Sequence, residues 1–278
     1  MAITYTPIRY PGGKTKLYSE IRAILVANEL LGCPYAELFA GGAGLAIKLL
    51  LKGDVSSIVI NDYDRAVYCM WDAIVNQGEK MCDFIDSAVL DIETWKTMRE
   101  IYQNHEGVDD FNLGAAAFYL NRTNVSGILS GGVIGGLNQT GNYKMDVRFN
   151  RDTLKRKIRD ISLRKDDIEV TRLDAEEFID KRMGDSGLFA YLDPPYVQKG
   201  PGLYRSAFDE KKHRSLAQKV GGAKSKWVVT YDADKLIDDI YGDYDRGDLE
   251  VSYTANVKTV GKEKIILGPR LAWPDCLK

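Results

Sequence analysis

The sequence predicts an α/β fold whose largely parallel sheet is closed at one edge by an antiparallel hairpin. Short apolar runs typical of buried strands alternate along the chain with helical patterns, as βαβ crossovers require. The last two runs are separated only by a short polar segment, residues 258–262, so we expect them to pair as the hairpin. The expected strands are 35–40, 57–61, 168–173, 188–192, 226–231, 249–253 and 264–267.

Helical periodicity fills most of the intervals between these strands, at residues 16–30, 45–51, 175–182 and 210–220. The alternation stops between residues 64 and 165, where three further helical patterns occur at 67–75, 95–102 and 113–120. They are followed by a glycine-rich segment, 121–144. Long loops of this kind inside a domain are usually functional, so we expect a flexible β-hairpin that orders against a partner.

The most informative motif is Asp193-Pro194-Pro195-Tyr196, which follows the apolar run 187–192. Because proline restricts its own φ and the residue before it, Asp193 and the Pro194 carbonyl are held in one arrangement. Open α/β sheets bind ligands beyond the carboxyl ends of their strands. Two fixed acceptors beside an aromatic ring suit a flat, amino-bearing ring such as an adenine. For this tetrapeptide alone, a strand-ending turn with a chance aspartate remains the alternative.

A second motif is a strand, a glycine-rich turn and a helix at residues 35–47, with Phe39 and Gly41 at the turn. Glycines let the backbone pass close to a nucleoside, and a helix start offers free N–H groups. Asp62 ends the next strand, where an acid can bind ribose hydroxyls. The dinucleotide fingerprint is incomplete because Ile47 replaces its third glycine, which disfavours a nicotinamide enzyme. A purely structural turn stays open for this pair.

The third motif is Tyr10-Pro11-Gly12-Gly13-Lys14, which precedes a helical stretch. Together and in this order, the three motifs resemble those of the DNA adenine methylases (Dam-like, D12 class). The resemblance implies a Rossmann-like S-adenosylmethionine-dependent methyltransferase sheet with an antiparallel closing hairpin. It further implies a catalytic domain at 1–63 and 166–278 and a helical and hairpin target-recognition domain at 64–165.

The resemblance implies site-specific transfer of the S-adenosylmethionine methyl group to the exocyclic amine of an adenine flipped out of double-stranded DNA. Its implied catalytic residues are Asp193, Pro194, Pro195 and Tyr196. Asp193 and the Pro194 carbonyl would accept the amine hydrogens, and Tyr196 would stack on the base. The implied cofactor-binding residues are Tyr10, Gly13, Lys14, Phe39, Gly41, Asp62, Asp174 and Asp193.

Asp174 precedes the helical pattern 175–182, so it could equally be only a helix N-cap, with Glu177 completing a capping box. For DNA, Asn121-Arg122 matches a family pair that precedes a DNA-facing hairpin. The DNA-binding candidates are Asn121, Arg122, Asn138, Lys144 and Arg148. The segment after the pair departs from the family pattern, so no target sequence carries over. Packing of Arg122 against an acidic neighbour remains the alternative.

Composition permits this function without indicating it. The net charge is −2 and the pI is near 5.9, but residues 148–165 and 199–226 each carry eight basic residues against two acids. These stretches could meet phosphates or form solvated helix faces. Four scattered cysteines and two histidines argue against a zinc site or a disulfide framework.

The chain shows neither a twenty-residue apolar stretch nor a secretory leader, so we expect a cytoplasmic protein, a monomer or weak dimer, without metal or membrane partner. Two rival functions remain: a DNA-binding regulator without turnover, and a methyltransferase acting on cytosine N4 or RNA adenine. The intact residues 12–14 and 193–196 argue against the regulator, and Asp193 favours DNA adenine. Whether a restriction nuclease accompanies the enzyme is left open.

Overall fold

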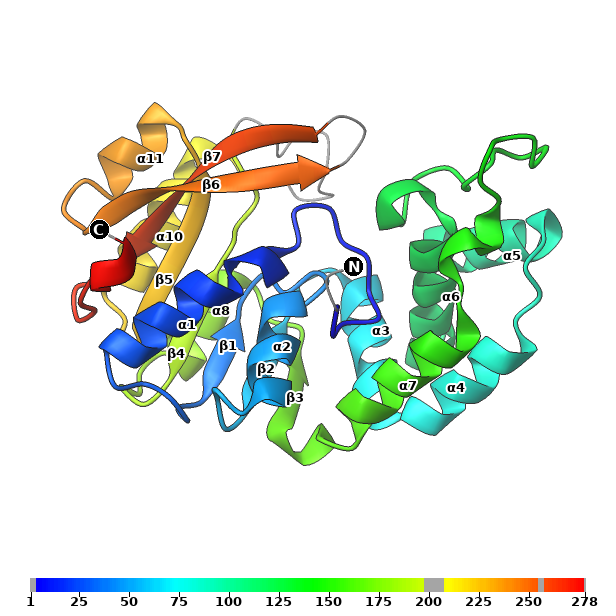
Figure 1. Cartoon of the computed structure of the whole chain (residues 1–278), viewed down its shortest axis with the longest axis horizontal. Coiled ribbons are helices and arrows are strands. Elements are labelled where there is room, and N and C mark those ends of the chain that lie inside the picture. The colour runs from blue at the N-terminus through cyan, green and yellow to red at the C-terminus, as the bar shows by residue number, and fades with distance from the viewer. Residues whose placement is uncertain (1–3, 198–207, 255–257, 278) are drawn as a thin grey trace.

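The computed structural model describes residues 4–197, 208–254 and 258–277. Its strands form one sheet and are β1 (Tyr35–Glu37), β2 (Ile58–Asn61), β3 (Ile168–Thr171), β4 (Phe189–Leu192), β5 (Lys226–Asp232), β6 (Arg246–Thr254) and β7 (Lys258–Leu267). The strand order is β3-β2-β1-β4-β5-β7-β6 (Figure 1). The first five strands are parallel, whereas β7 runs antiparallel to both β5 and β6. The expected fold class is confirmed.

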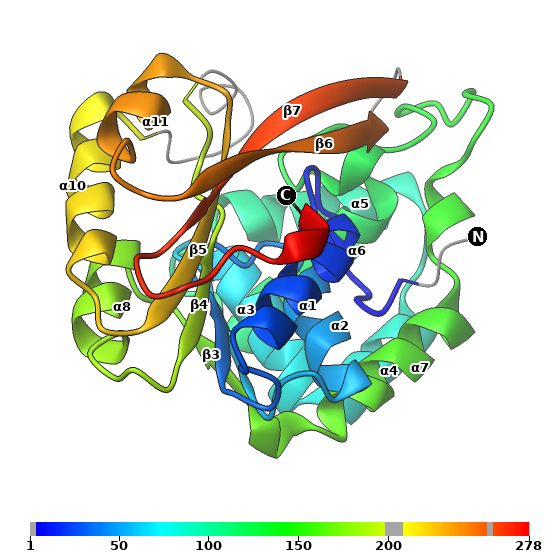
Figure 2. The same cartoon turned by 60° about the vertical axis from the view of Figure 1, so that its left-hand side comes forward.

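The closing hairpin is longer than predicted. The polar residues 258–262, expected to connect the last two strands, belong to β7, and pairing continues to Thr254 opposite Lys258. Strand pairing uses backbone groups and does not need apolar side chains, which is why the hydrophobic pattern missed this extension. Figure 2 shows the hairpin extending beyond the rest of the sheet.

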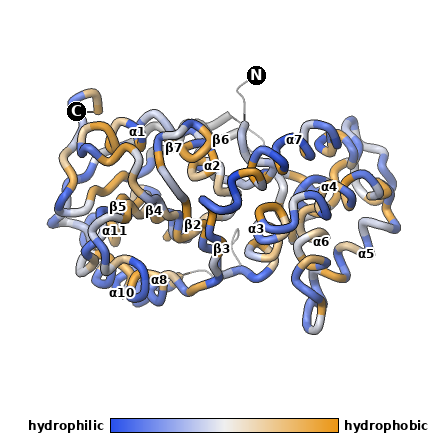
Figure 3. The backbone as a smooth tube through the Cα atoms, turned by 90° about the horizontal axis from the view of Figure 1, so that it is seen from below, coloured by the Kyte–Doolittle hydropathy of each residue, from blue (hydrophilic) through white to orange (hydrophobic). Residues whose placement is uncertain are grey.

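Helices cover both faces of the sheet. Beside one face lie α1 (Tyr18–Ala27), which follows the 3-10 turn η1 (Lys14–Leu17), together with α2 (Gly44–Lys52) and α3 (Arg65–Asn76). On the other face lie α8 (Ala175–Arg182), α10 (Glu210–Gly221) and α11 (Lys235–Ile240). In Figure 3 the central strands β4 and β5 are largely hydrophobic between these helices.

The remaining helices gather beyond α3, on the right of Figure 1. They are α4 (Gly78–Ser87), α5 (Ile92–Gln103), α6 (Asp110–Thr123) and α7 (Arg151–Ser162). Their buried residues belong to the same hydrophobic cluster as α1, α2 and α3. The core is therefore continuous across residue 64, and the proposed domain boundaries at 64 and 165 remain a prediction.

Side-chain caps determine where these helices begin. Asp64, Asp91, Asp109 and Asn150 accept hydrogen bonds from backbone N–H groups in the first turns of α3, α5, α6 and α7. Short polar side chains at this position satisfy donors that a helix start otherwise leaves free. Each of these helices therefore starts at a position marked in the sequence.

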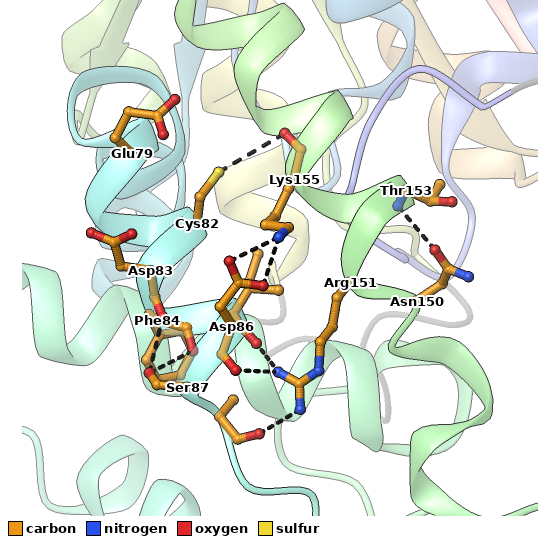
Figure 4. Close-up of polar contacts among 12 residues, drawn as sticks. Glu79, Cys82, Asp83, Phe84, Asp86, Ser87, Asn150, Arg151, Thr153 and Lys155 are labelled. Atoms are coloured by element: carbon orange, nitrogen blue, oxygen red, sulfur yellow. Dashed lines mark hydrogen bonds and ion pairs between the residues drawn. The ribbon is translucent and has the colours of Figure 1, made fainter.

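Much of the basic run 148–165 serves the packing of α7 on α4 (Figure 4). Lys155 donates to both oxygens of Asp86 at 2.6 and 2.8 Å, and Arg159 pairs with Glu79 at 2.9 Å. Arg151 donates to three backbone carbonyls around the end of α4. These cations have partners within the fold, so only part of the run can face phosphates. In the second basic stretch, residues 199–207 lie outside the described residues.

The glycine-rich segment differs from the expected flexible hairpin. Residues 121–123 end helix α6, and among the described residues of this segment one isolated β-bridge joins Asn124 to Val133. Asn124 donates to the carbonyls of Ile128 and Leu129, while Val133 is buried. The segment is a loop of successive turns and not a hairpin ladder: the N–H groups of Gly127, Ile128, Gly131 and Gly136 each donate to the carbonyl three residues earlier, and the Asn124 side-chain amide adds further bonds.

In the described part of the chain, the helices are all too short or too polar to traverse a lipid bilayer.

Candidate active site

A cavity of about 930 Å³ opens at the carboxyl ends of the parallel strands. Its walls include residues that directly follow β1, β2, β3 and β4, and β1 is where the strand order reverses. Ligand sites of doubly wound sheets lie at such reversal points. The volume is at the upper end of the usual range for small-molecule sites, so the cavity can hold a nucleoside-sized ligand together with part of a second molecule.

The cavity gathers most of the predicted cofactor residues from distant parts of the chain. Tyr10, Gly13, Lys14, Phe39, Asp62, Asp174 and Asp193 all line it. Gly41 is not among the lining residues. Pro195 also lines the cavity, whereas Pro194 and Tyr196 are buried without forming its wall.

Gly41 shapes the turn from behind. Its φ of +46° lies in the left-handed region, and a Cβ there would come within 2.7 Å of the Tyr10 ring. Its N–H donates to Oδ2 of Asp62 at 2.9 Å. Ala43, two residues further along the same turn, also has a positive φ of +41°, which is a strained conformation for a residue with a Cβ. Glycine is therefore required at 41 for packing and backbone shape together.

Asp62 and Asp174 present carboxylates to the cavity. Besides Gly41, Asp62 accepts at Oδ1 from the N–H of Asp64, and burial raises the pKa of Asp62 to about 7. Each carboxylate oxygen can accept more than one hydrogen bond, so both remain able to bind hydroxyl groups. Asp174 is the N-cap of α8, accepting from Glu176, and also contacts Lys212 at 3.2 Å.

Asp174 therefore caps helix α8 and also lines the cavity. The expected capping box with Glu177 is corrected, because the Glu177 carboxylate instead binds Lys181 one turn along α8.

The carboxylate of Asp193 is oriented by two donors on one oxygen. Its Oδ1 accepts from the Thr230 hydroxyl at 2.9 Å and lies 3.1 Å from Nζ of Lys14. Thr230 has a single hydroxyl hydrogen and donates it to Asp193. The Tyr191 hydroxyl is therefore the donor in its 2.7 Å hydrogen bond with the Thr230 hydroxyl oxygen. Among the described residues, Oδ2 of Asp193 receives no such donor, so it is the acceptor available to a substrate amine.

Burial raises the pKa of Asp193 to about 6, with Glu263 acting in the same sense and Lys14 and Thr230 opposing it. For Lys14, burial lowers the pKa, but Asp193 and Glu263 raise it by more, so the pKa lies above its usual value. At neutral pH the site therefore holds an ammonium and an ionised Asp193.

Of the DNA-binding candidates, Asn121 has a structural role here. Its side chain is 1% exposed, donates to the carbonyls of Arg9 and Gly127, and accepts from the Arg9 N–H at 2.9 Å. The predicted DNA contact by Asn121 is corrected, because the buried amide is occupied within the fold. It fixes the residue before Tyr10 and thereby one wall of the cavity.

Arg122 and Arg148 belong to a basic cluster that we define as Arg9, Arg122, Arg148 and Lys157. Arg122 donates to the carbonyls of Pro7 and Arg148, not to an acidic neighbour. Burial and, after it, the positive charges of Arg9 and Arg148 lower the pKa of Arg122. Burial and the charge of Arg148 likewise lower the pKa of Arg9. In the described residues the cluster contains no ion pair, so its positive charge is uncompensated.

Asn138 and Lys144 lie on the loop surface. Both side chains are exposed, and the Lys144 ammonium donates to the carbonyl of Gln139. Leu137 and Tyr143 beside them are exposed by 59% and 68%. Their accessibility is compatible with contact to a macromolecule, and their role in DNA binding stays a prediction.

Several site residues were missed in the sequence. Glu37 lines the cavity at the end of β1, and burial raises its pKa to about 8. Thr230 and Glu263 act on Asp193 from strands far along the chain, and Arg9 and Lys157 complete the basic cluster. Only Glu37 carried a usable signal, an acidic residue ending an apolar strand just before the glycine turn.

The described residues hold no group of three or more His, Cys, Asp or Glu side chains arranged to bind a metal ion.

The fold and the cavity define a class: an α/β enzyme of the methyltransferase type, with Asp-Pro-Pro-Tyr at the carboxyl end of β4. The chain belongs to the family described as D12 class N6 adenine-specific DNA methyltransferase, which it matches over residues 10–255. It is accordingly a DNA methyltransferase acting on the N6 position of adenine.

Individual relatives are more distant. The chain is 24% identical over 250 residues to the Type II methyltransferase M.CviBI of Paramecium bursaria Chlorella virus NC1A, covering 88% of this chain and 90% of that protein. Among solved structures it is similar to the rRNA methyltransferase AviRa from Streptomyces viridochromogenes, with a TM-score of 0.40 and 12% identity over 93% of this chain and 86% of the other.

A precorrin-6y C5,15-methyltransferase from Geobacter metallireducens GS-15 gives a TM-score of 0.36 at 11% identity, over 89% of this chain and 87% of the other.

Proposed function

We propose that the enzyme uses S-adenosylmethionine to methylate an adenine that has been flipped out of double-stranded DNA, at specific sites. The observation that carries this proposal is the meeting of Lys14, Asp62, Asp174 and Asp193 around one cavity. These residues come from all three sequence motifs and from the end of β3. The cavity that they line, about 930 Å³, is large enough for a nucleoside-sized ligand and part of a second molecule.

The residues present fit the cofactor. Asp62 can accept hydrogen bonds from ribose hydroxyls, and Asp174 can accept from an adenine amino group. Phe39 offers an aromatic ring, which packs edge-on against Phe208 with ring centroids 5.9 Å apart. When bound, S-adenosylmethionine supplies an electrophilic methyl group attached to a sulfonium.

Asp193 would prepare the substrate amine. The exocyclic nitrogen of adenine is a poor nucleophile because its lone pair is delocalised into the ring. A hydrogen bond from the amine to Oδ2 of Asp193 would hold the nitrogen with its lone pair out of the ring plane. The Pro194 carbonyl, whose residue does not line the cavity, stays the predicted second acceptor. The preorganised donors on Oδ1 keep the carboxylate in place, so orientation and fixed dipoles provide most of the rate.

DNA would approach from the side of the basic cluster. Arg9 directly precedes the cavity residue Tyr10, and its backbone lies against Gly127, which also lines the cavity. Uncompensated positive charge beside an active site attracts a phosphate backbone. Arg148 is the exposed member of this cluster and, with the exposed Asn138 and Lys144, is proposed to contact the duplex.

Base-resolved methylation mapping of DNA from cells that express this chain tests the proposal. We expect N6-methyladenine at one short sequence, and none in cells that express Asp193→Ala. In vitro, tritium from the labelled methyl group of S-adenosylmethionine should enter duplex DNA. Methylation of cytosine, or no methylation by a folded protein, would overturn the proposal.

A further inference from the structure

Glu263 is a buried carboxylate beside the catalytic motif that none of the sequence motifs contains. It lies on β7, opposite Asp232 of β5, and its side chain has no exposed surface. A buried carboxylate is costly unless it is paired and hydrogen-bonded. The contacts of Glu263 therefore indicate what it is retained for.

Those contacts join two motifs through one oxygen atom. Oε1 of Glu263 accepts from the Tyr196 hydroxyl at 2.7 Å and from Nζ of Lys14 at 3.2 Å. Lys14 also donates to the Tyr196 hydroxyl and lies 4.9 Å from the centre of its ring. Lys14 and Tyr196 are thus fixed by a residue from the far end of the chain.

The same lysine reaches Asp193. Nζ of Lys14 lies 3.1 Å from Oδ1 of Asp193, and its side chain is only 8% exposed. One buried ammonium is therefore shared between two carboxylates. Lys14 therefore neutralises only part of the negative charge of Asp193. The Asp193 oxygens remain stronger acceptors for a substrate amine than they would be in a one-to-one ion pair.

We propose that Glu263 is a positioning residue for methyl transfer, which holds Lys14 and Tyr196 in place and divides the lysine charge between itself and Asp193. This inference rests on the proposed role of Asp193 as the amine acceptor. Glu263 itself does not line the cavity and touches neither ligand in this scheme.

Other ionisable groups near Asp193 are Glu37 and Tyr35 of β1, Tyr191 of β4 and Tyr231 of β5. Burial raises the pKa of each tyrosine well above its usual value, so these stay neutral through the neutral range. Glu37 titrates there, but it is unchanged in every variant below.

The test compares wild type with Glu263→Gln, which keeps the side-chain volume and an oxygen acceptor for Tyr196. Because glutamine carries no charge, Lys14 pairs with Asp193 alone in this variant, and the pKa of Asp193 should fall by roughly one unit. Carboxyl ¹³C NMR titration, with the signal assigned through Asp193→Asn, measures this without turnover. The turnover number should fall roughly tenfold or more, with much smaller changes in both KM values.

Glu263→Asp retains the charge but shortens the reach by one carbon. It should restore the wild-type pKa of Asp193 while leaving turnover reduced. The matched control is Asp54→Asn, since Asp54 is likewise buried and binds a tyrosine hydroxyl and a cation, Tyr18 at 2.6 Å and Arg22 at 2.8 Å, away from the cavity. This control should leave the Asp193 titration, the turnover number and both KM values unchanged.

An unchanged Asp193 titration and turnover in Glu263→Gln would overturn the inference, as would equal changes in Asp54→Asn. A wild-type protein that transfers no methyl group would instead refute the proposed function. The NMR titration decides the coupling between Glu263 and Asp193 in that case as well.

Discussion

The backbone N–H of Gly41 donates to Oδ2 of Asp62 at 2.9 Å, which ties the turn after β1 to the end of β2. The two elements that would hold a nucleoside are thereby fixed relative to each other before a ligand arrives. Preorganisation of this kind reduces the ordering cost of binding. Asp62 thus has two tasks, supporting the turn and offering acceptors to the cavity.

Asp62→Ala should weaken S-adenosylmethionine binding by roughly 1–3 kcal/mol, because a buried acceptor and the support of Gly41 are lost together. Isothermal titration calorimetry measures the effect. The reference ligand is NAD, which the incomplete dinucleotide motif should bind poorly. If wild type bound NAD as tightly as S-adenosylmethionine, the assignment of this cavity would be wrong.

Cofactor affinity should also depend on pH through Asp62. The pKa of Asp62 is raised to about 7, so the carboxylate that accepts from hydroxyl groups is protonated as the pH falls from 8 to 6. We expect wild-type affinity to decrease over this interval and the decrease to be smaller in Asp62→Asn. Identical pH profiles for the two proteins would remove Asp62 from the binding site.

Glu37→Gln should stabilise the protein at alkaline pH. The pKa of Glu37 is about 8 in the folded state, above its unfolded value, so its favourable contribution is complete below the unfolded pKa and is lost as pH rises through about 8. The glutamine oxygen can still accept from Ala46 and Tyr35, as Glu37 does now. Urea unfolding at pH 8.5 should show a gain of roughly 1–4 kcal/mol.

At pH 5.5 the gain should be smaller, since the wild-type Glu37 is protonated there. Glu79→Gln is the control, because Glu79 is an exposed carboxylate whose pKa is lowered by Arg159 and which does not titrate in this interval. A wild-type stability that is constant between the two pH values would contradict the buried, protonated state of Glu37.

Local patterns predicted much of this structure. Helix α8 has the predicted bounds, because a capping aspartate and an apolar stripe mark it within its own segment. The residues at the ends of β1, β2 and β4 were predicted as a site, because parallel strands bring their carboxyl ends to one edge. These inferences need only short-range pattern and sheet geometry.

What the sequence did not predict depends on long-range contacts. Glu263 stands between the expected connection, 258–262, and the expected strand, 264–267, and only the pairing of β7 with β5 gives it a place. Asn121 looks like a surface recognition residue, yet it bonds to Arg9, which lies 112 residues earlier. Helix α7 reads as a charged, solvated segment because its partners on α4 cannot be deduced from its own residues.

Thr230→Val should raise the pKa of Asp193, the opposite direction from Glu263→Gln. The hydroxyl donates to Oδ1 of Asp193, and losing a hydrogen bond to the charged form disfavours it, by roughly one pKa unit. In the plot of turnover number against pH, the acidic limb should therefore move to higher pH. Thr123→Val removes an equally buried hydroxyl that binds Tyr119 in α6, and it should leave the limb unchanged.

The last prediction separates DNA contacts from packing within one basic run. Arg148 is exposed and takes part in no ion pair of the described residues, whereas Lys155 is bound to Asp86 (Figure 4). Arg148→Gln should weaken binding to all duplex sequences and reduce the salt dependence of binding by about one counterion. Lys155→Gln should leave the salt dependence unaltered, because its charge is already compensated within the fold. Fluorescence anisotropy between 50 and 200 mM salt, roughly the range in which phosphate contacts dominate affinity, measures both. Equal slopes for Arg148→Gln and wild type would place the phosphate contacts elsewhere, in the stretch from residue 208 to 226 or in the residues that precede it.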